Sequence, residues 1–74
     1  MTTVTKKEIR EIIDTLDITA SEFARRTYVS RSYISHILAG RKKNPSRLWA
    51  SMVAILCRKN RLGDIADMIE GRIG

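Results

Sequence analysis

The sequence has few of the residues that hold very small domains together. Its 74 residues include one cysteine, Cys57, one histidine, His36, and one proline. A single cysteine cannot form an internal disulfide, and one cysteine with one histidine is too few for a structural zinc site. The chain therefore has to fold by packing alone, and we expect Cys57 to act as a small buried hydrophobic residue.

Long hydrophobic runs are also absent. No segment approaches the roughly 18 consecutive apolar residues that a membrane helix needs. Residues 1–7 lack the apolar core of a signal peptide. These absences predict a cytoplasmic protein without a membrane partner, and the length predicts a single domain over residues 1–74.

The sequence lacks the residue sets that enzymes use. It has no candidate pair of catalytic carboxylates, no Ser-His-Asp combination, no glycine-rich phosphate loop and no cluster of metal-binding residues. We therefore expect neither catalysis nor a bound metal, cofactor or small-molecule ligand. The function has to be sought in binding to another macromolecule.

Acidic residues are missing from the middle of the chain. The segment from Arg25 to Arg61 contains no aspartate or glutamate, whereas the segments on either side of it are net acidic and the whole chain carries a net charge of +6. Such a stretch is typical of a surface that faces a polyanion, because counterion release favours binding. The alternative is a solvated face with an incidental excess of one sign. The basic residues are Arg25, Arg26, Arg31, Arg41, Lys42, Lys43, Arg47, Arg58, Lys59 and Arg61.

Two capping boxes predict two helices in the first part of the chain. Thr5 stands three residues before Glu8, and Thr19 three residues before Glu22. In each box the threonine hydroxyl can accept from the glutamate amide while the carboxylate accepts from the threonine amide. The first helix is predicted to end near Leu16 and to bury Ile9, Ile12, Ile13 and Leu16. The second is short, with Phe23, Ala24 and Thr27 facing inward.

A third helix is predicted from Ser30 to Ala39. Ser30 is its N-cap, and Gly40 stands at the position where a left-handed residue closes a helix. Its inward residues are Ile34, Ile37 and Leu38.

Two more helices follow a basic loop. Pro45 and Ser46 restart the chain, and the longest helix runs from Ser46 to about Asn60. Asp64, after Gly63, is predicted to cap a last helix that carries Ile65, Met68 and Ile69. In the longest helix the predicted apolar stripe is Leu48, Met52, Ile55 and Leu56, with Trp49 and Val53 beside it. The fold class is therefore all-α, with about five helices.

Residues 23–40, FARRTYVSRSYISHILAG, resemble the helix-turn-helix of the phage Cro/repressor-like family. The resemblance rests on Phe23-Ala24, Val29-Ser30, Ile34-Ser35, Gly40 and the later Asn44-Pro45-Ser46. Tyr28 departs from the pattern, because the family usually has glycine in the turn. Either the turn has another geometry, or Tyr28 is strained at a positive φ while its hydroxyl has a use.

The resemblance implies binding to the major groove of double-stranded DNA. The third helix would contact base edges through Arg31, Ser32, Ser35 and His36. Arg31 is the foremost of these, because guanidinium can bind guanine in a bidentate manner, whereas His36 is alternatively an exposed residue without a partner. Contacts to the DNA backbone are expected from Ser21, Ser30, Tyr33, Arg41, Lys42, Lys43 and Arg47.

The last third of the chain has more apolar residues than one helix face requires. We therefore predict a homodimer through this segment, which would bind an inverted repeat. The predicted interface consists of Trp49, Val53, Leu62, Ile65, Met68 and Ile69. The alternative is that a small bundle buries all of this surface.

The simplest function for such a domain is transcriptional repression by occluding a promoter. A phage repressor, a restriction-modification controller and an anti-CRISPR-associated repressor all fit the length. An antitoxin that neutralises a toxin and regulates its own promoter is the main alternative, although a tail for wrapping a toxin is not expected after Gly74.

Overall fold

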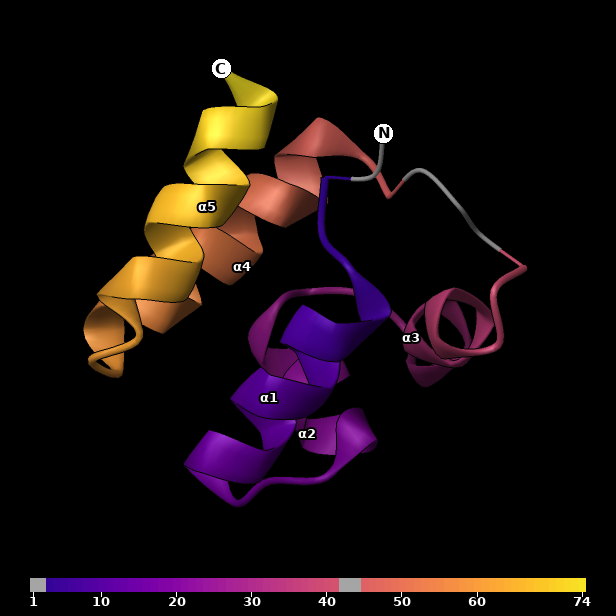
Figure 1. Cartoon of the computed structure of the whole chain (residues 1–74). Helices are drawn as coiled ribbons and strands as arrows, with labels where there is room; N and C mark the ends of the chain where they lie inside the picture. The colour runs from indigo at the N-terminus through magenta and orange to yellow at the C-terminus, as the bar shows by residue number, and fades with distance from the viewer. Residues whose placement is uncertain (1–2, 42–44) are drawn as a thin grey trace.

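The chain folds into a bundle of helices, as the computed structural model shows for residues 3–41 and 45–74 (Figure 1). The described residues form five helices and no strand, which confirms the all-α prediction. The helices are α1 (Lys6–Leu16), α2 (Ala20–Arg26), α3 (Arg31–Leu38), α4 (Arg47–Lys59) and α5 (Gly63–Ile73). None of them is both long and apolar enough to cross a membrane.

Hydroxyl side chains cap the first four helices. The Thr5 hydroxyl accepts from the Glu8 amide at 3.1 Å and the Thr5 amide donates to the Glu8 carboxylate at 3.0 Å, so the first predicted capping box is complete. The Thr19 hydroxyl accepts from the Glu22 amide, but the Glu22 carboxylate binds elsewhere, and only half of the second box forms. Ser30 and Ser46 cap α3 and α4.

The start of α5 differs from the prediction. The helix begins at Gly63, with Leu62 at the N-cap position and no side-chain cap. Asp64 therefore lies inside the first turn instead of capping it. There its carboxylate faces the positive end of the helix dipole, which stabilises a helix without a direct hydrogen bond.

The first four helices end in the same way, with a residue in the left-handed region. These residues are Asp17, Tyr28, Gly40 and Arg61, with φ between 53° and 77°. After each of them the next amide donates to the carbonyl five residues back, as Val29 does to Ala24 at 3.0 Å and Leu62 to Cys57 at 2.8 Å. This is the Schellman arrangement, which satisfies carbonyls at the helix end. Glycine and, less often, aspartate adopt this conformation, whereas Tyr28 and Arg61 are strained in it.

Trp49 on α4 links the core to the helix-turn-helix. Its ring makes edge contacts with Phe23 of α2, at a centroid distance of 6.2 Å, and with Tyr33 of α3, at 5.3 Å. All five helices contribute to the core. Its buried residues are Val4, Ile9, Ile12, Phe23, Ala24, Ile34, Ile37, Trp49, Ala50, Val53, Ala54, Cys57, Ile65, Ala66 and Ile69.

The predicted apolar stripe of α4 is not its buried face. Leu48 and Ile55 are exposed and Met52 is only half-buried. The buried face of the helix is instead Trp49, Ala50, Val53, Ala54 and Cys57. This face includes two alanines and a cysteine, small residues that let neighbouring helices approach closely, and it leaves the larger aliphatic side chains outside.

Cys57 is buried, as expected, and burial together with the nearby Glu8 carboxylate raises the pKa of its thiol to about 11. The thiol therefore stays protonated at neutral pH and is a poor nucleophile.

Ion pairs fasten α5 to the rest of the bundle. Arg58 of α4 pairs with Asp67 and Glu70 of α5 on the surface. Arg72 of α5 pairs with Glu8 of α1 at 2.5 Å, and this Glu8 carboxylate is almost fully buried. The surface pairs contribute little to stability, whereas the buried pair holds the C-terminal helix against the start of the chain.

Candidate nucleic-acid interface

The turn between α2 and α3 contains residues 27–30 and is built from local hydrogen bonds. Thr27 is buried, and its hydroxyl donates to the Phe23 carbonyl at 2.9 Å. The buried Ala24 of α2 has no side chain beyond its β-carbon, which leaves room for α3 to pack closely. The sequence therefore specifies a short, tight connection between the two helices.

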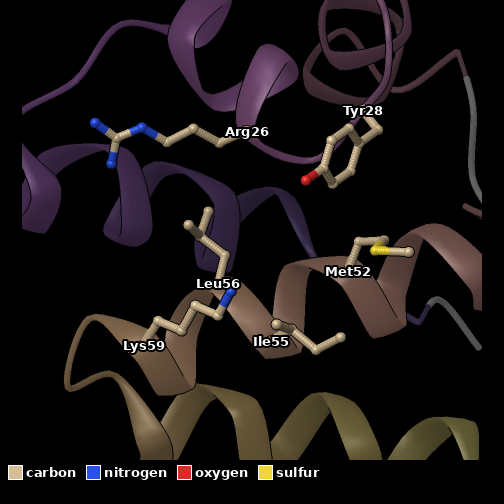
Figure 2. A pocket seen from close by; sticks show the side chains of 6 residues that line it. All are labelled: Arg26, Tyr28, Met52, Ile55, Leu56 and Lys59. Atoms are coloured by element: carbon tan, nitrogen blue, oxygen red, sulfur yellow. The ribbon is translucent and has the colours of Figure 1, made fainter.

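Tyr28 adopts a left-handed conformation at φ 62°, so of the two predicted alternatives the turn keeps its geometry and the tyrosine is strained. Its side chain is exposed and points toward α4 near Met52 (Figure 2). Tyr28 therefore has both a strained backbone and an aromatic ring that is exposed to solvent.

Replacing Tyr28 with glycine is expected to stabilise the fold by about 0.5–1 kcal/mol, because glycine adopts positive φ without steric conflict. Arg61→Gly is the matched control, since Arg61 has φ 63° at the end of α4. The two gains should be similar, because both residues adopt positive φ and both are exposed. Urea denaturation of both variants measures the effect, and a loss of stability in both would contradict it.

The core fixes the orientation of α3. Ile34 and Ile37 are buried, and Tyr33 packs on Trp49 while its hydroxyl accepts from the Ser46 amide at 3.2 Å. At its N-terminus the Ser30 hydroxyl accepts from the Tyr33 amide at 3.1 Å. These contacts leave the other side of the helix open.

The four residues predicted to read bases are all exposed on this open side. Arg31 and Ser35, and likewise Ser32 and His36, lie four positions apart along α3, so the four residues form one face of the helix. Arg31 enters none of the ion pairs found among the described residues. The structure therefore brings the predicted set together, and their contacts with bases stay a prediction.

Loss of the cap of α3 is expected to weaken the fold. Ser30→Ala removes the acceptor of the Tyr33 amide and should lower the free energy of unfolding by about 1 kcal/mol. Ser51→Ala is a suitable control, because it removes a hydroxyl inside a helix and should change stability by only a few tenths of a kcal/mol. Thermal unfolding followed by circular dichroism compares the two, and equal effects would contradict the prediction.

The residues predicted to contact the DNA backbone fall into three groups: exposed residues, residues that also have a structural role, and residues outside the described part of the chain. Ser21, Arg41 and Arg47 are exposed at the start of α2, after α3 and at the start of α4. Ser30 and Tyr33 already have structural roles, as the cap of α3 and as a packing partner of Trp49, although a hydroxyl can still bind a phosphate. Lys42 and Lys43 lie outside the described residues.

Lys6 is a basic residue near this surface that sequence reasoning missed. A β-carbon at Gly40 would lie 3.9 Å from the Lys6 amino group, so this group lies beside the turn that ends α3. The preceding segment is fixed there as well, because the Thr3 hydroxyl donates to the Pro45 carbonyl at 2.9 Å. Lys6 stands in the net acidic part of the sequence, and no local pattern indicates that it lies beside the turn that ends α3.

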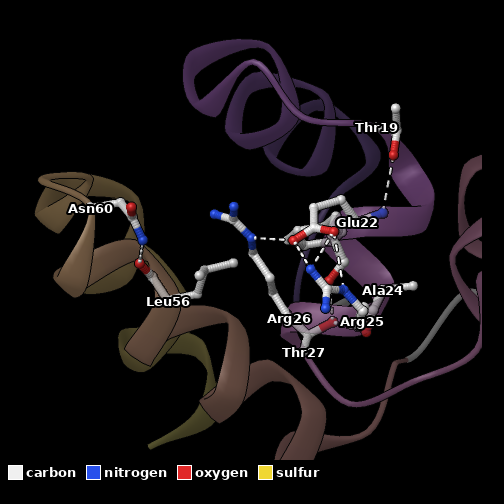
Figure 3. A network of polar contacts seen from close by, with 9 residues as sticks. Thr19, Glu22, Ala24, Arg25, Arg26, Thr27, Leu56 and Asn60 are labelled. Carbon is white, nitrogen blue, oxygen red and sulfur yellow. Dashed lines mark hydrogen bonds and ion pairs between the residues drawn. The ribbon is translucent and has the colours of Figure 1, made fainter.

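Arg25 and Arg26 bind one carboxylate on α2. Both donate to Glu22, with closest distances of 2.7 and 2.9 Å (Figure 3). These hydrogen bonds lower the pKa of Glu22 to about 2, so the carboxylate stays charged at neutral pH. With Arg58, which pairs with Asp67 and Glu70, three of the ten basic residues in the middle of the chain are thus partly neutralised.

Four of the six residues predicted to form the dimer interface are not at the surface. Trp49, Val53, Ile65 and Ile69 are buried in the core of a single chain, so their side chains are not available to a second copy. The prediction failed there because a helix with apolar residues on several sides does not reveal which side is inward. Of the predicted set, Met68 is exposed and Leu62 is half-buried.

Comparison with known protein families gives one match, to a family described as "Helix-turn-helix", over residues 7–50. The matched segment includes all of α2 and α3 and reaches the first turn of α4. It leaves out residues 51–74 and therefore does not test the predicted dimer segment. No match was found among curated proteins or among solved structures.

Proposed function

Because the chain belongs to the Cro/repressor-type helix-turn-helix family and is a DNA-binding transcription regulator, we propose that it represses transcription as a homodimer on an inverted-repeat operator. The observation that carries this proposal is the exposed polar face of α3, formed by Arg31, Ser32, Ser35 and His36. Occupancy of the operator would then exclude the transcription machinery from the promoter.

Sequence recognition is assigned to α3 in the major groove. Arg31, at the first position of the helix, can donate two hydrogen bonds to O6 and N7 of a guanine. Ser32 and Ser35 are short and reach base edges only if the helix lies deep in the groove. His36 can donate to a guanine or to a phosphate. The core contacts of Ile34 and Ile37 would keep this face in a fixed position.

Affinity and register are assigned to the basic residues around α3. Arg41 and Arg47 flank the loop that follows α3, and Lys6 adds an amino group from α1 beside Gly40. Lys42 and Lys43 belong to the same loop in the sequence. Contacts of this kind bind phosphates without reading bases, so they set the salt dependence of binding.

A two-fold dimer would place two reading helices about 34 Å apart, which is one turn of DNA. Met68→Asp is expected to shift the protein toward monomer and to lower its affinity for a full operator more than for a half-site. Sedimentation velocity and titration of both duplexes measure this. A wild-type protein that remains monomeric at tens of micromolar with its duplex would contradict the dimer.

The proposal is tested by selecting bound sequences from a random duplex pool at moderate salt. The expected result is a palindromic motif with a guanine in each half-site. Charge alone would retain all sequences equally, so enrichment of no motif would overturn sequence-specific binding. A single unrepeated motif would instead contradict only the dimer.

The alternative function is an antitoxin-type protein that binds a partner toxin and also regulates its own promoter. It would need a second surface, suited to a protein, in addition to the DNA-binding face. An exposed apolar surface between the α2–α3 turn and α4 is the observation that keeps this alternative open.

A further inference from the structure

Three of the four large hydrophobic residues that are exposed among the described residues lie close together. Tyr28 is 82% exposed, Leu48 72% and Ile55 48%, and the fourth residue, Met68, is on α5. Tyr28 and Leu48 share one hollow, and Tyr28 and Ile55 share another. Exposed apolar residues that gather in this way usually mark a binding surface.

We call this surface the α4 groove. Its larger part, of about 440 Å³, is lined by Arg26, Tyr28, Met52, Ile55, Leu56 and Lys59. Figure 2 shows Tyr28 and Met52 together at one end and Arg26 and Lys59 at the other. A second part, of about 180 Å³, extends past Tyr28 to Leu48.

The dimensions and pattern of the groove suit a helix. From Leu48 to Lys59 the axis of α4 extends roughly 16 Å, because a helix rises 1.5 Å per residue. Leu48, Met52 and Ile55 follow one another at spacings of four and three residues, which forms a seam along α4. A partner helix of about three turns could place its own apolar stripe against this seam.

The charges of the groove favour an acidic partner. Lys59 is basic, Arg26 is basic but shares the Glu22 carboxylate through its Nε, and no acidic residue lines either part of the groove. A two-fold contact between copies of the chain through this face would bring two basic rims together, which is unfavourable. Carboxylates beside an apolar stripe would complement both the rim and the floor.

The strain at Tyr28 supports a role for this surface in binding. A residue at φ 62° with an exposed aromatic ring destabilises the free domain, and glycine at this position would remove both effects. Burial of the ring by a partner would offset this cost. None of the residues that line the groove belongs to the set assigned to base reading.

We propose that the α4 groove binds an amphipathic helix of a partner protein, with apolar residues against Tyr28, Met52 and Ile55 and carboxylates against Arg26 and Lys59. The proposal does not depend on repression or on dimerisation. It gives the regulator a second binding surface, separate from α3, through which a protein can act on the DNA-bound state.

The test uses the ¹⁵N-labelled full chain and a synthetic amphipathic peptide of about four helical turns, with leucines in a stripe and glutamates elsewhere. The expected result is a set of chemical-shift changes confined to the groove and retained when a DNA duplex is bound. Lys59→Glu should weaken binding of this acidic peptide roughly three- to fivefold. The same substitution should strengthen binding of a control peptide that has lysine in place of each glutamate. Ile55→Asp should abolish binding, whereas Thr15→Asp places the same charge on an exposed position of α1 outside the groove and should not.

Four results would overturn the proposal. Absence of shifts at millimolar peptide would show that the groove binds no helix of this kind, and equal binding of the two peptides would leave only non-specific apolar contact. Shifts of the groove residues with protein concentration alone would assign the groove to a second copy. Displacement of the peptide by DNA would assign the groove to the DNA-binding surface.

Discussion

Arg31→Ala is expected to remove the preference for one base pair in each half-site and to lower the affinity for the best operator by about 1–3 kcal/mol. Arg31 is exposed at the first position of α3, where its guanidinium can reach O6 and N7 of a guanine. Affinity for unrelated duplexes should change much less. Titration of the selected operator, and of versions altered at each position, measures the effect.

Arg41→Ala is the matched control, because it removes the same charge from an exposed residue beyond the end of α3. It should weaken binding to all sequences alike and reduce the slope of log affinity against log salt by about one. Both residues are at the surface, so neither change should alter stability by more than about 0.5 kcal/mol. If Arg31→Ala weakens all duplexes equally, Arg31 contacts the backbone and another residue reads the base.

The start and end of α3 could be predicted because both are encoded locally. Ser30 has a hydroxyl at the position where a helix begins, and Gly40 can adopt the positive φ that ends it. Ile34 and Ile37 lie one turn apart and were assigned correctly to the core. The exposed face of α3 then follows from helical geometry alone.

The face of α4 could not be predicted in this way. The helix has apolar residues on several sides, and the predicted stripe consists of Leu48, Met52, Ile55 and Leu56. Close packing between helices selected the smaller Ala50 and Ala54 instead. The sequence shows how much apolar surface a helix has, but which side is buried depends on the size of neighbours that are distant in sequence.

Contacts between the ends of the chain were also beyond sequence reasoning. Glu8 was predicted as a capping residue, and it does accept from the Thr5 amide. Its ion pair with Arg72 joins residues 64 positions apart. No local pattern indicates such a pair, because its formation depends on where α5 packs.

Loss of the Glu8–Arg72 pair is expected to have a large effect on stability. Glu8→Gln should lower the free energy of unfolding by about 2–3 kcal/mol at neutral pH, because Arg72 is left largely buried without a counterion. Glutamine can still accept from the Thr5 amide through its oxygen, so the capping bond is retained while the charge is removed. Glu11→Gln removes an exposed charge from the same helix and serves as control.

The effect should depend on pH in a defined direction. Burial raises the pKa of Glu8, but the hydrogen bonds from Arg72 and Thr5 and the charge of Arg72 outweigh it, and the pKa lies below its ordinary value of 4.5. A group whose pKa is lowered by folding stabilises the fold above its unfolded pKa and loses this contribution as the pH falls through the folded pKa. The difference between wild type and Glu8→Gln should therefore be largest at neutral pH and shrink as the pH falls below 4.5.

Urea denaturation at several pH values measures this difference directly, and comparison with the variant removes the contributions of other carboxylates such as Glu22. Adding Arg72→Met to Glu8→Gln should recover part of the lost stability, because no unpaired charge then remains buried. A difference that stays constant or grows on acidification would mean that Glu8 acts through its capping bond and not through its charge. In a domain of this size, whose total stability is of the order of 5–15 kcal/mol, a loss of this magnitude would raise the unfolded fraction about 30- to 150-fold. The Glu8–Arg72 pair would thus add a charge interaction to the apolar contacts of Ile65, Ala66 and Ile69 that hold α5 in the bundle.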